Sequence, residues 1–241
     1  MKRKKLLIYI GFFTVLLAGF YFLVFRDYNF SASPLKVINA NIADFKFTTQ
    51  DGDTLVQKDL DDKVYVAEYF FTTCKGICPK MNTNMRRVWN EYKNEEQFAI
   101  LSHTCMPEVD SLPLLKQYEK QMINGILVNN FDGTYKLQAN AMDTATNKNW
   151  YFLTGNKTDL YKMARQGYMI DDGKPDSTTL IKDQFIHTQF FALVDKNHRL
   201  RGIYDGLKGE EVTALIADIR GLLKEKITTK RFMTGFSNNP G

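Results

Sequence analysis

The sequence has 241 residues and a formal net charge of +5, and 44% of its residues are hydrophobic. This length and composition suit one sizeable globular domain with appendages. Lys2, Arg3, Lys4 and Lys5 supply most of the net charge, so the rest of the chain is nearly neutral. This balance argues against a nucleic-acid-binding surface, and we expect no nucleic-acid partner.

The N-terminus carries a basic segment, residues 1–5, followed by an uncharged apolar run at 6–25. About 20 apolar residues span a bilayer as a helix, whereas the apolar part of a cleavable signal is usually about 7–15 residues long. The pattern predicts an uncleaved single-pass anchor in the cell inner membrane. Because positive charge stays in the cytoplasm, the rest of the chain should lie in the periplasm or an equivalent extracytoplasmic space. The alternative is a long signal peptide cleaved near Ser31–Ser33.

The remainder divides into a linker at 26–39, one domain at 40–225 and a C-terminal tail at 226–241. Short hydrophobic runs, alternating or continuous, predict strands at 45–48, 64–71, 98–101, 150–154, 190–194 and 200–204. Apolar residues at helical spacing predict helices at 80–92, 112–122, 156–164 and 212–223. The first strand should open a short N-terminal hairpin, and the alternation of strands and helices predicts an α/β domain. The stretch 125–148 has no assigned structure.

Two of the three cysteines, Cys74 and Cys78, directly follow the continuous apolar run at 64–71. If a helix starts at Cys78, with Pro79 as its first residue, sulfurs four positions apart lie on one face. Such a pair of thiols can form a disulfide, exchange one with a partner, or hold a soft metal. Three cysteines are too few to staple an extracytoplasmic domain, so we expect the pair to carry chemistry.

Two histidines differ in their sequence context. His198 lies in a predicted hairpin turn, where we expect a solvated side chain. His187 immediately precedes a buried strand, where an imidazole needs a partner. On its own, this position indicates a core histidine with a satisfied hydrogen bond rather than a ligand.

Three further residues could assist the cysteine site. His103 and Cys105 follow the strand at 98–101, whose C-terminal end should share a sheet edge with Cys74; they are either auxiliary residues or packing residues. Glu68 lies six positions before Cys74, an offset that resembles the buried carboxylate that assists proton transfer in thioredoxins. It could instead pair with Lys63 or an arginine. Unpaired and buried, it should keep its proton.

The sequence resembles the Sco/SenC family. The residues that carry the resemblance are Thr72-Thr73-Cys74-x-x-x-Cys78-Pro79, Trp150-x-x-Leu153-Thr154-Gly155, and His187 ahead of an apolar strand and an Asp-x-x-x-Arg hairpin. Members are membrane-tethered copper proteins with a thioredoxin-like fold that are implicated in assembling cytochrome c oxidase. The resemblance covers roughly residues 40–225. It implies a thioredoxin-like fold for the domain.

The same resemblance implies that Cys74, Cys78 and His187 are copper ligands. Two thiolates and one imidazole suit Cu(I), and with an added ligand they can hold Cu(II). The chain departs from the family at Lys75-Gly76, where many members have Pro-Asp, and a lysine there would favour ionised thiols. The family's Ser-Val-Asp-Pro-like segment is also altered, because residues 102–107 lack the aspartate and contain a histidine and a cysteine.

We therefore expect a metallochaperone that delivers copper to a cytochrome c oxidase subunit carrying a copper site. The alternative is an enzyme, a thiol-disulfide reductase that attacks through Cys74, resolves through Cys78, and acts on cysteines of an oxidase subunit or another extracytoplasmic protein. A peroxidase is a weaker interpretation, because the sequence reveals neither an activating base nor a pocket shaped for peroxide.

Overall fold

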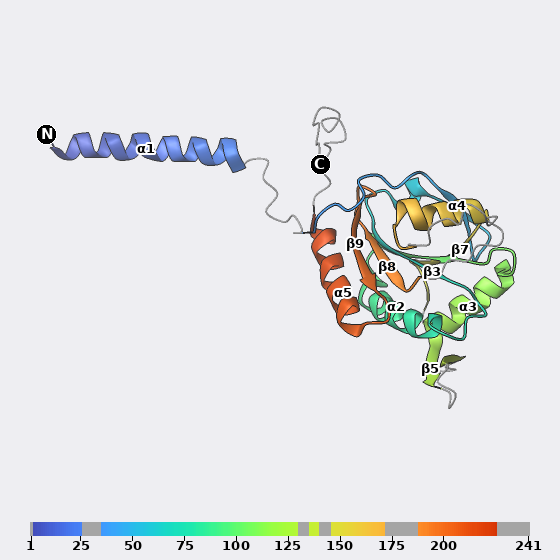
Figure 1. Cartoon of the computed structure of the whole chain (residues 1–241). Helices are drawn as coiled ribbons and strands as arrows, with labels where there is room; N and C mark the ends of the chain where they lie inside the picture. The colour runs from blue at the N-terminus through green and yellow to red at the C-terminus, as the bar shows by residue number, and fades with distance from the viewer. Residues whose placement is uncertain (1, 26–34, 130–134, 140–145, 172–187, 226–241) are drawn as a thin grey trace.

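The computed structural model describes residues 2–25, 35–129, 135–139, 146–171 and 188–225, and a seven-stranded mixed sheet forms its centre (Figure 1). The strand order is β2-β1-β7-β4-β3-β8-β9. The three central strands are parallel: β7 (Trp150–Thr154), β4 (Phe98–Thr104) and β3 (Val64–Phe70). Antiparallel hairpins close the two edges: β1 (Lys46–Thr49) with β2 (Thr54–Val56), and β8 (Phe190–Val194) with β9 (Leu200–Asp205).

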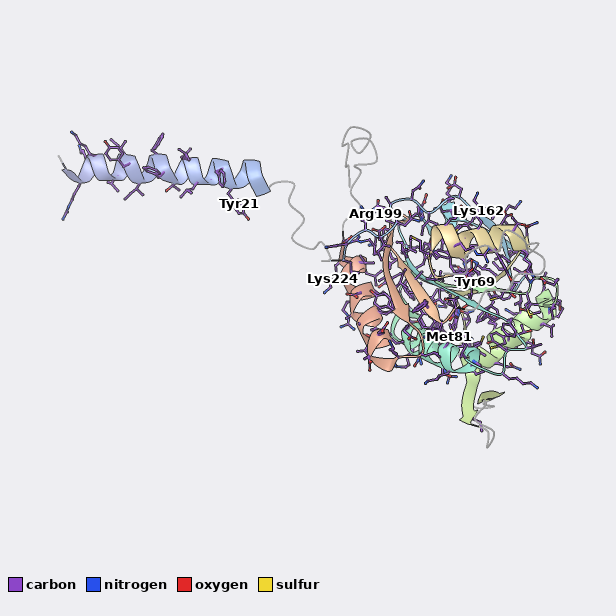
Figure 2. The ribbon with its side chains drawn as sticks, in the orientation of Figure 1. Tyr21, Tyr69, Met81, Lys162, Arg199 and Lys224 are labelled. Carbon is purple, nitrogen blue, oxygen red and sulfur yellow. The ribbon has the colours of Figure 1, made fainter. Side chains whose placement is uncertain are left out.

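Helices cover both faces of the sheet. One face packs against α2 (Cys78–Tyr92), α3 (Leu112–Asn124) and α5 (Gly209–Lys224). The other packs against α4 (Lys157–Lys162), the π-helical turn η2 (Met163–Gly167) and the 3-10 turn η1 (Gln57–Leu60). Side chains of β3 alternate between the two cores, as the pleat requires. Figure 2 shows the result, with Met81 on the α2 side and Tyr69 on the α4 side.

The predicted N-terminal helix is α1 (Lys2–Phe25), which stands apart from the domain in Figure 1. Its apolar side chains, among them Leu7 and Phe20, are exposed. It is the one helix in the described part of the chain that is long and apolar enough to cross a membrane. Exposed apolar side chains along a whole helix suit a lipid surrounding better than water.

The described domain begins at Leu35. The Arg201 guanidinium Nη2 donates to the Leu35 carbonyl at 2.7 Å, and the Ile38 amide donates to the Leu200 carbonyl at 2.8 Å. Residues 35–39, which the sequence placed in the linker, therefore pack on β9. The rest of the predicted linker, 26–34, and the predicted tail, 226–241, lie outside the described residues.

The α/β fold and the N-terminal β-hairpin are confirmed. Within the unassigned stretch, β5 (Gly125–Asn129) pairs with β6 (Tyr135–Ala139) as a separate two-stranded sheet. The helix expected to continue through Ala164 changes from α-helical to π-helical geometry at Met163, so α4 is shorter than predicted. The change lets the Tyr168 amide donate to the Met163 carbonyl, a five-residue step.

His198 contradicts the expectation of a solvated side chain. It lies in the β8–β9 turn as predicted, but only 6% of its surface is exposed, and its Nε2 lies 2.8 Å from Asp61 Oδ1. The reason is that the segment entering the domain covers this turn, with the Ile42 amide donating to the His198 carbonyl. That contact joins positions 156 residues apart, so local sequence could not reveal it.

Candidate metal centre

The cysteine pair lies where β3 ends and α2 begins. β3 ends at Phe70, one residue earlier than predicted, and α2 starts at Cys78 with Pro79 in its first turn, so the condition under which the two sulfurs share a face is met. Cys74 is partly exposed and Cys78 is 4% exposed; both thiols are free and share a side-chain hydrogen bond. The two sulfurs are therefore adjacent, with one accessible from solvent.

The two thiols differ strongly in acidity. The hydrogen bond from the Cys78 thiol lowers the pKa of Cys74 to about 6, against the opposing effect of burial, and the backbone amides of Cys78, Gly76 and Ile77 stabilise the thiolate further. The same hydrogen bond and burial raise the pKa of Cys78. At neutral pH the pair thus holds one thiolate and one proton. Lys75, which is exposed, is not among the main causes of the lowered pKa, contrary to the sequence-based expectation.

The sulfurs line a cavity of about 470 Å³ whose other walls are mainly aromatic and aliphatic. Cys74, Cys78 and Cys105 all contribute to it, and Thr188 lines it as well. His187, the predicted third ligand, lies outside the described residues. Thr188, the next residue in the sequence, lies in the wall of this cavity. Sulfur ligands in an apolar chamber fit a soft metal ion.

Asp110 holds the cysteine loop in place, a role that the sequence did not reveal. Its buried carboxylate accepts hydrogen bonds from the Thr72 amide, the Thr72 hydroxyl and the Thr104 hydroxyl. Thr72 lies two residues before Cys74, and Thr104 ends β4. The carboxylate thus joins the loop after β3 to the loop after β4. An aspartate just ahead of a helix reads as a local capping residue, and only the fold pairs it with a threonine 38 positions away.

The two auxiliary candidates that the sequence placed after the strand at 98–101, His103 and Cys105, separate in the structure. Cys105 lines the cavity, whereas His103 does not. His103 is fully buried and lies against the rings of Phe47, Tyr69 and Tyr168, with its Nε2 3.3 Å from the Tyr168 hydroxyl. Burial lowers the pKa of His103 to about 3. Because β4 continues through Thr104, longer than predicted, His103 points into the core below the sheet edge.

Glu68 is also separate from the cavity lining. It is fully buried, its Oε1 accepts a hydrogen bond of 2.6 Å from the Ser102 hydroxyl, and its Oε2 has no hydrogen-bond partner among the described residues. The expected pairing with Lys63 or an arginine is wrong, because no ion pair to Glu68 occurs in the described ranges. Burial raises the pKa of Glu68 to about 8, so the carboxyl group keeps its proton at neutral pH.

Within the described part of the chain, no three His, Cys, Asp or Glu side chains already form a closed metal-ligand set. The candidate site there consists of the adjacent sulfurs of Cys74 and Cys78 and a third cysteine, Cys105, in the same cavity. The Asp110 carboxylate joins the segments that carry them.

Comparison with known proteins gives a match to the family model described as SCO1/SenC over residues 37–224. A curated relative, the SCO1 protein homolog of Bacillus subtilis (strain 168), is 26% identical over 185 residues, which cover 76% of this chain and 83% of the relative.

Solved structures give the same picture. A SCO1/SenC family lipoprotein from Bacillus anthracis str. Ames is 28% identical, with a TM-score of 0.59, covering 78% of this chain and 97% of that one. BsSco, described as a cytochrome c oxidase assembly protein with a disulfide switch, is 25% identical with a TM-score of 0.59, covering 80% and 98%. ScoI of Bradyrhizobium japonicum, solved with copper bound, is 17% identical with a TM-score of 0.52, covering 76% and 100%, and shows likeness of fold alone.

Proposed function

This chain belongs to the SCO1/SenC family, and from that membership we propose that it binds copper at Cys74, Cys78 and His187 and delivers it during assembly of cytochrome c oxidase. The domain would work on the extracytoplasmic side of the inner membrane, held there by α1. The recipient would be the oxidase subunit that carries a copper site.

One observation carries this proposal: two hydrogen-bonded thiols lie side by side at an apolar cavity, and one of them is partly exposed. Thiolate sulfur is the donor that Cu(I) prefers. Copper transfer requires that a ligand of the recipient displace a ligand of the donor. An exposed ligand on a loop allows this. His187 would complete the site from the segment that leads into β8, since Thr188 already lines the cavity.

The pKa values of the two thiols determine how many protons are released when copper binds. Cys74, with a pKa of about 6, offers copper a thiolate at neutral pH. Cys78, whose pKa is raised by its hydrogen bond to Cys74 and by burial, must release its proton as the metal–sulfur bond forms. Copper binding should therefore release about one proton from this pair at neutral pH.

A second candidate function is thiol-disulfide reduction, and the lowered pKa of Cys74 favours it. A partly exposed thiolate next to a protonated thiol is the arrangement of an attacking and a resolving cysteine. The substrate would be a disulfide in an oxidase subunit or another extracytoplasmic protein. The two functions share Cys74 and Cys78 and differ in their need for His187.

The test compares His187→Ala with Cys74→Ser in the full-length protein, measuring copper affinity, thiol-disulfide exchange and oxidase assembly in a deletion strain. We expect His187→Ala to lose at least about tenfold in copper affinity, because even outer-shell changes cost 10–100-fold, while its thiols still exchange. Both variants should fail in assembly. Full assembly with His187→Ala and none with Cys74→Ser would instead make thiol exchange the function.

A further inference from the structure

A third sulfur lies in the cavity of the proposed copper site. Cys105 is 2% exposed and, with Cys74 and Cys78, contributes to the wall of the same 470 Å³ cavity. Its thiol is free of any disulfide. The fold thus brings all three cysteines of the sequence to one chamber, although Cys105 is 27 positions beyond Cys78.

The backbone of Cys105 is hydrogen-bonded to the end of β3 and to α4. Its amide donates to the Phe70 carbonyl at 2.7 Å, and its carbonyl accepts from the Tyr161 hydroxyl at 3.0 Å. Thr104, the preceding residue, shares the Asp110 carboxylate with Thr72. These contacts fix the backbone of Cys105 relative to the end of β3, so its side chain stays at the wall of the cavity that Cys74 and Cys78 also line.

The chemistry of copper gives this sulfur a use. Cu(I) is soft and takes thiolate ligands, whereas imidazole nitrogen suits Cu(II) better. Building on the proposed function, we propose that Cys105 is an additional sulfur ligand for Cu(I), so that Cys74, Cys78 and Cys105 hold the reduced ion together.

Binding of Cu(I) to the Cys105 sulfur needs no oxidant or reductant. Cu(I) replaces the thiol proton of Cys105, the proton passes to solvent, and the oxidation state of copper does not change. The three sulfurs do not yet form a closed ligand set among the described side chains, so the cysteine side chains must rotate when the ion enters. The cavity provides room for that rotation.

The experiment uses the full-length protein in detergent under anaerobic conditions, with Cu(I) as the probe and a chromophoric Cu(I) chelator as competitor. Cys105→Val keeps a small apolar side chain and removes the sulfur; Cys105→Ser is the second variant. We expect Cu(I) affinity to fall by at least about tenfold in both, judged by the 10–100-fold cost of even outer-shell changes. Cu(II) binding and its thiolate–copper absorption should be unchanged.

X-ray absorption of the Cu(I)-loaded wild type gives an independent result that needs no variant. Three copper–sulfur bonds are expected, falling to two in Cys105→Val. Two copper–sulfur bonds in the wild type, or equal Cu(I) affinity in wild type and a folded Cys105→Val, would overturn the proposal while leaving copper binding by the pair intact. Failure of the wild type to bind copper at all would instead remove the proposed function.

Discussion

At the scale of single residues, Glu68 shows what burial does to a carboxyl group in this fold. It accepts a hydrogen bond from Ser102, whose hydroxyl oxygen in turn accepts from Trp150 Nε1 at 2.8 Å. This network suits the neutral acid, because Oε2 has no partner in the described part of the chain. Burial raises the pKa of Glu68 to about 8, above the ordinary value of 4.5. The folded state therefore retains a proton that the unfolded chain releases above pH 4.5.

The sign of the resulting pH dependence follows from linkage. The favourable contribution of protonated Glu68 is fully present below pH 4.5 and is lost as pH rises through about 8. Glu68→Gln, which stays neutral in both states, should raise the free energy of unfolding by on the order of 3 kcal/mol at pH 7, from 1.36 kcal/mol per pKa unit, and by almost nothing at pH 4. Denaturant unfolding at several pH values measures this.

Glu96→Gln is the matched control, because Glu96 is exposed and should show no such trend. A stability difference between wild type and Glu68→Gln that does not change with pH would mean that the carboxyl group is ionised in the folded protein.

At the scale of elements, the decisive contact is between two loops. The carboxylate of Asp110 binds Thr72 before the cysteine pair and Thr104 before Cys105. It thereby sets the spacing between the chain that leaves β3 and the chain that leaves β4. Because β3 and β4 are parallel and in register from Val64 with Phe98 to Phe70 with Thr104, both loops leave the same edge of the sheet. One buried acceptor there joins the two segments that carry the three cysteines.

Replacing that acceptor should loosen the site. Asp110→Ala leaves the Thr72 amide and two threonine hydroxyls without their acceptor, so we expect a loss of about 1–3 kcal/mol of unfolding free energy. Amide hydrogen exchange at Thr72 should accelerate while that of central β3 residues changes only with global stability. Asp44→Ala, at an exposed aspartate, is the control. Unchanged exchange at Thr72 would show that the backbone holds the loop without the carboxylate.

The sequence predicted the elements well because their signals are local. The apolar run of β3, the spacing of Cys74 and Cys78 and the turn before β9 each depend on neighbouring residues. Asp110 with Thr72 and His198 with Asp61 depend on partners far along the chain. The same limit applies to β4. It continues three residues beyond its predicted end, to Thr104, and this places His103 in the core and Cys105 at the cavity.

At the scale of the whole molecule, the chain enters the domain at the end opposite Cys74. Leu35 binds Arg201, which follows the first residue of β9. That residue, Leu200, pairs with Val194, and Val194 pairs with Tyr65 near the start of β3. The seven residues of β3, at about 3.3 Å each, then lead roughly 20 Å to the cysteine loop. If α1 is the anchor, the site lies at the end of the domain remote from its attachment to the membrane segment.

Arg201 also binds Glu225, the residue after α5, with both terminal nitrogens of its guanidinium. The first and last described residues of the domain thus meet at one side chain. If α1 is a membrane anchor, this arrangement leaves the cysteine loop free to face a partner in the same membrane.

This arrangement makes a topological prediction. The full-length protein should fractionate with membranes and resist carbonate extraction, since α1 supplies a span of sufficient length and apolar character. Deletion of residues 2–25 should release the domain. In spheroplasts, a membrane-impermeant maleimide should label Cys74 without lysis, because Cys74 is the most exposed of the three cysteines and the four basic residues at the start of α1 keep that end in the cytoplasm. Cys74→Ser is the labelling control. Labelling only after lysis would show the opposite orientation. A soluble wild-type protein whose N-terminus lies near Ser33 would show that residues 1–32 are a cleaved signal and not an anchor.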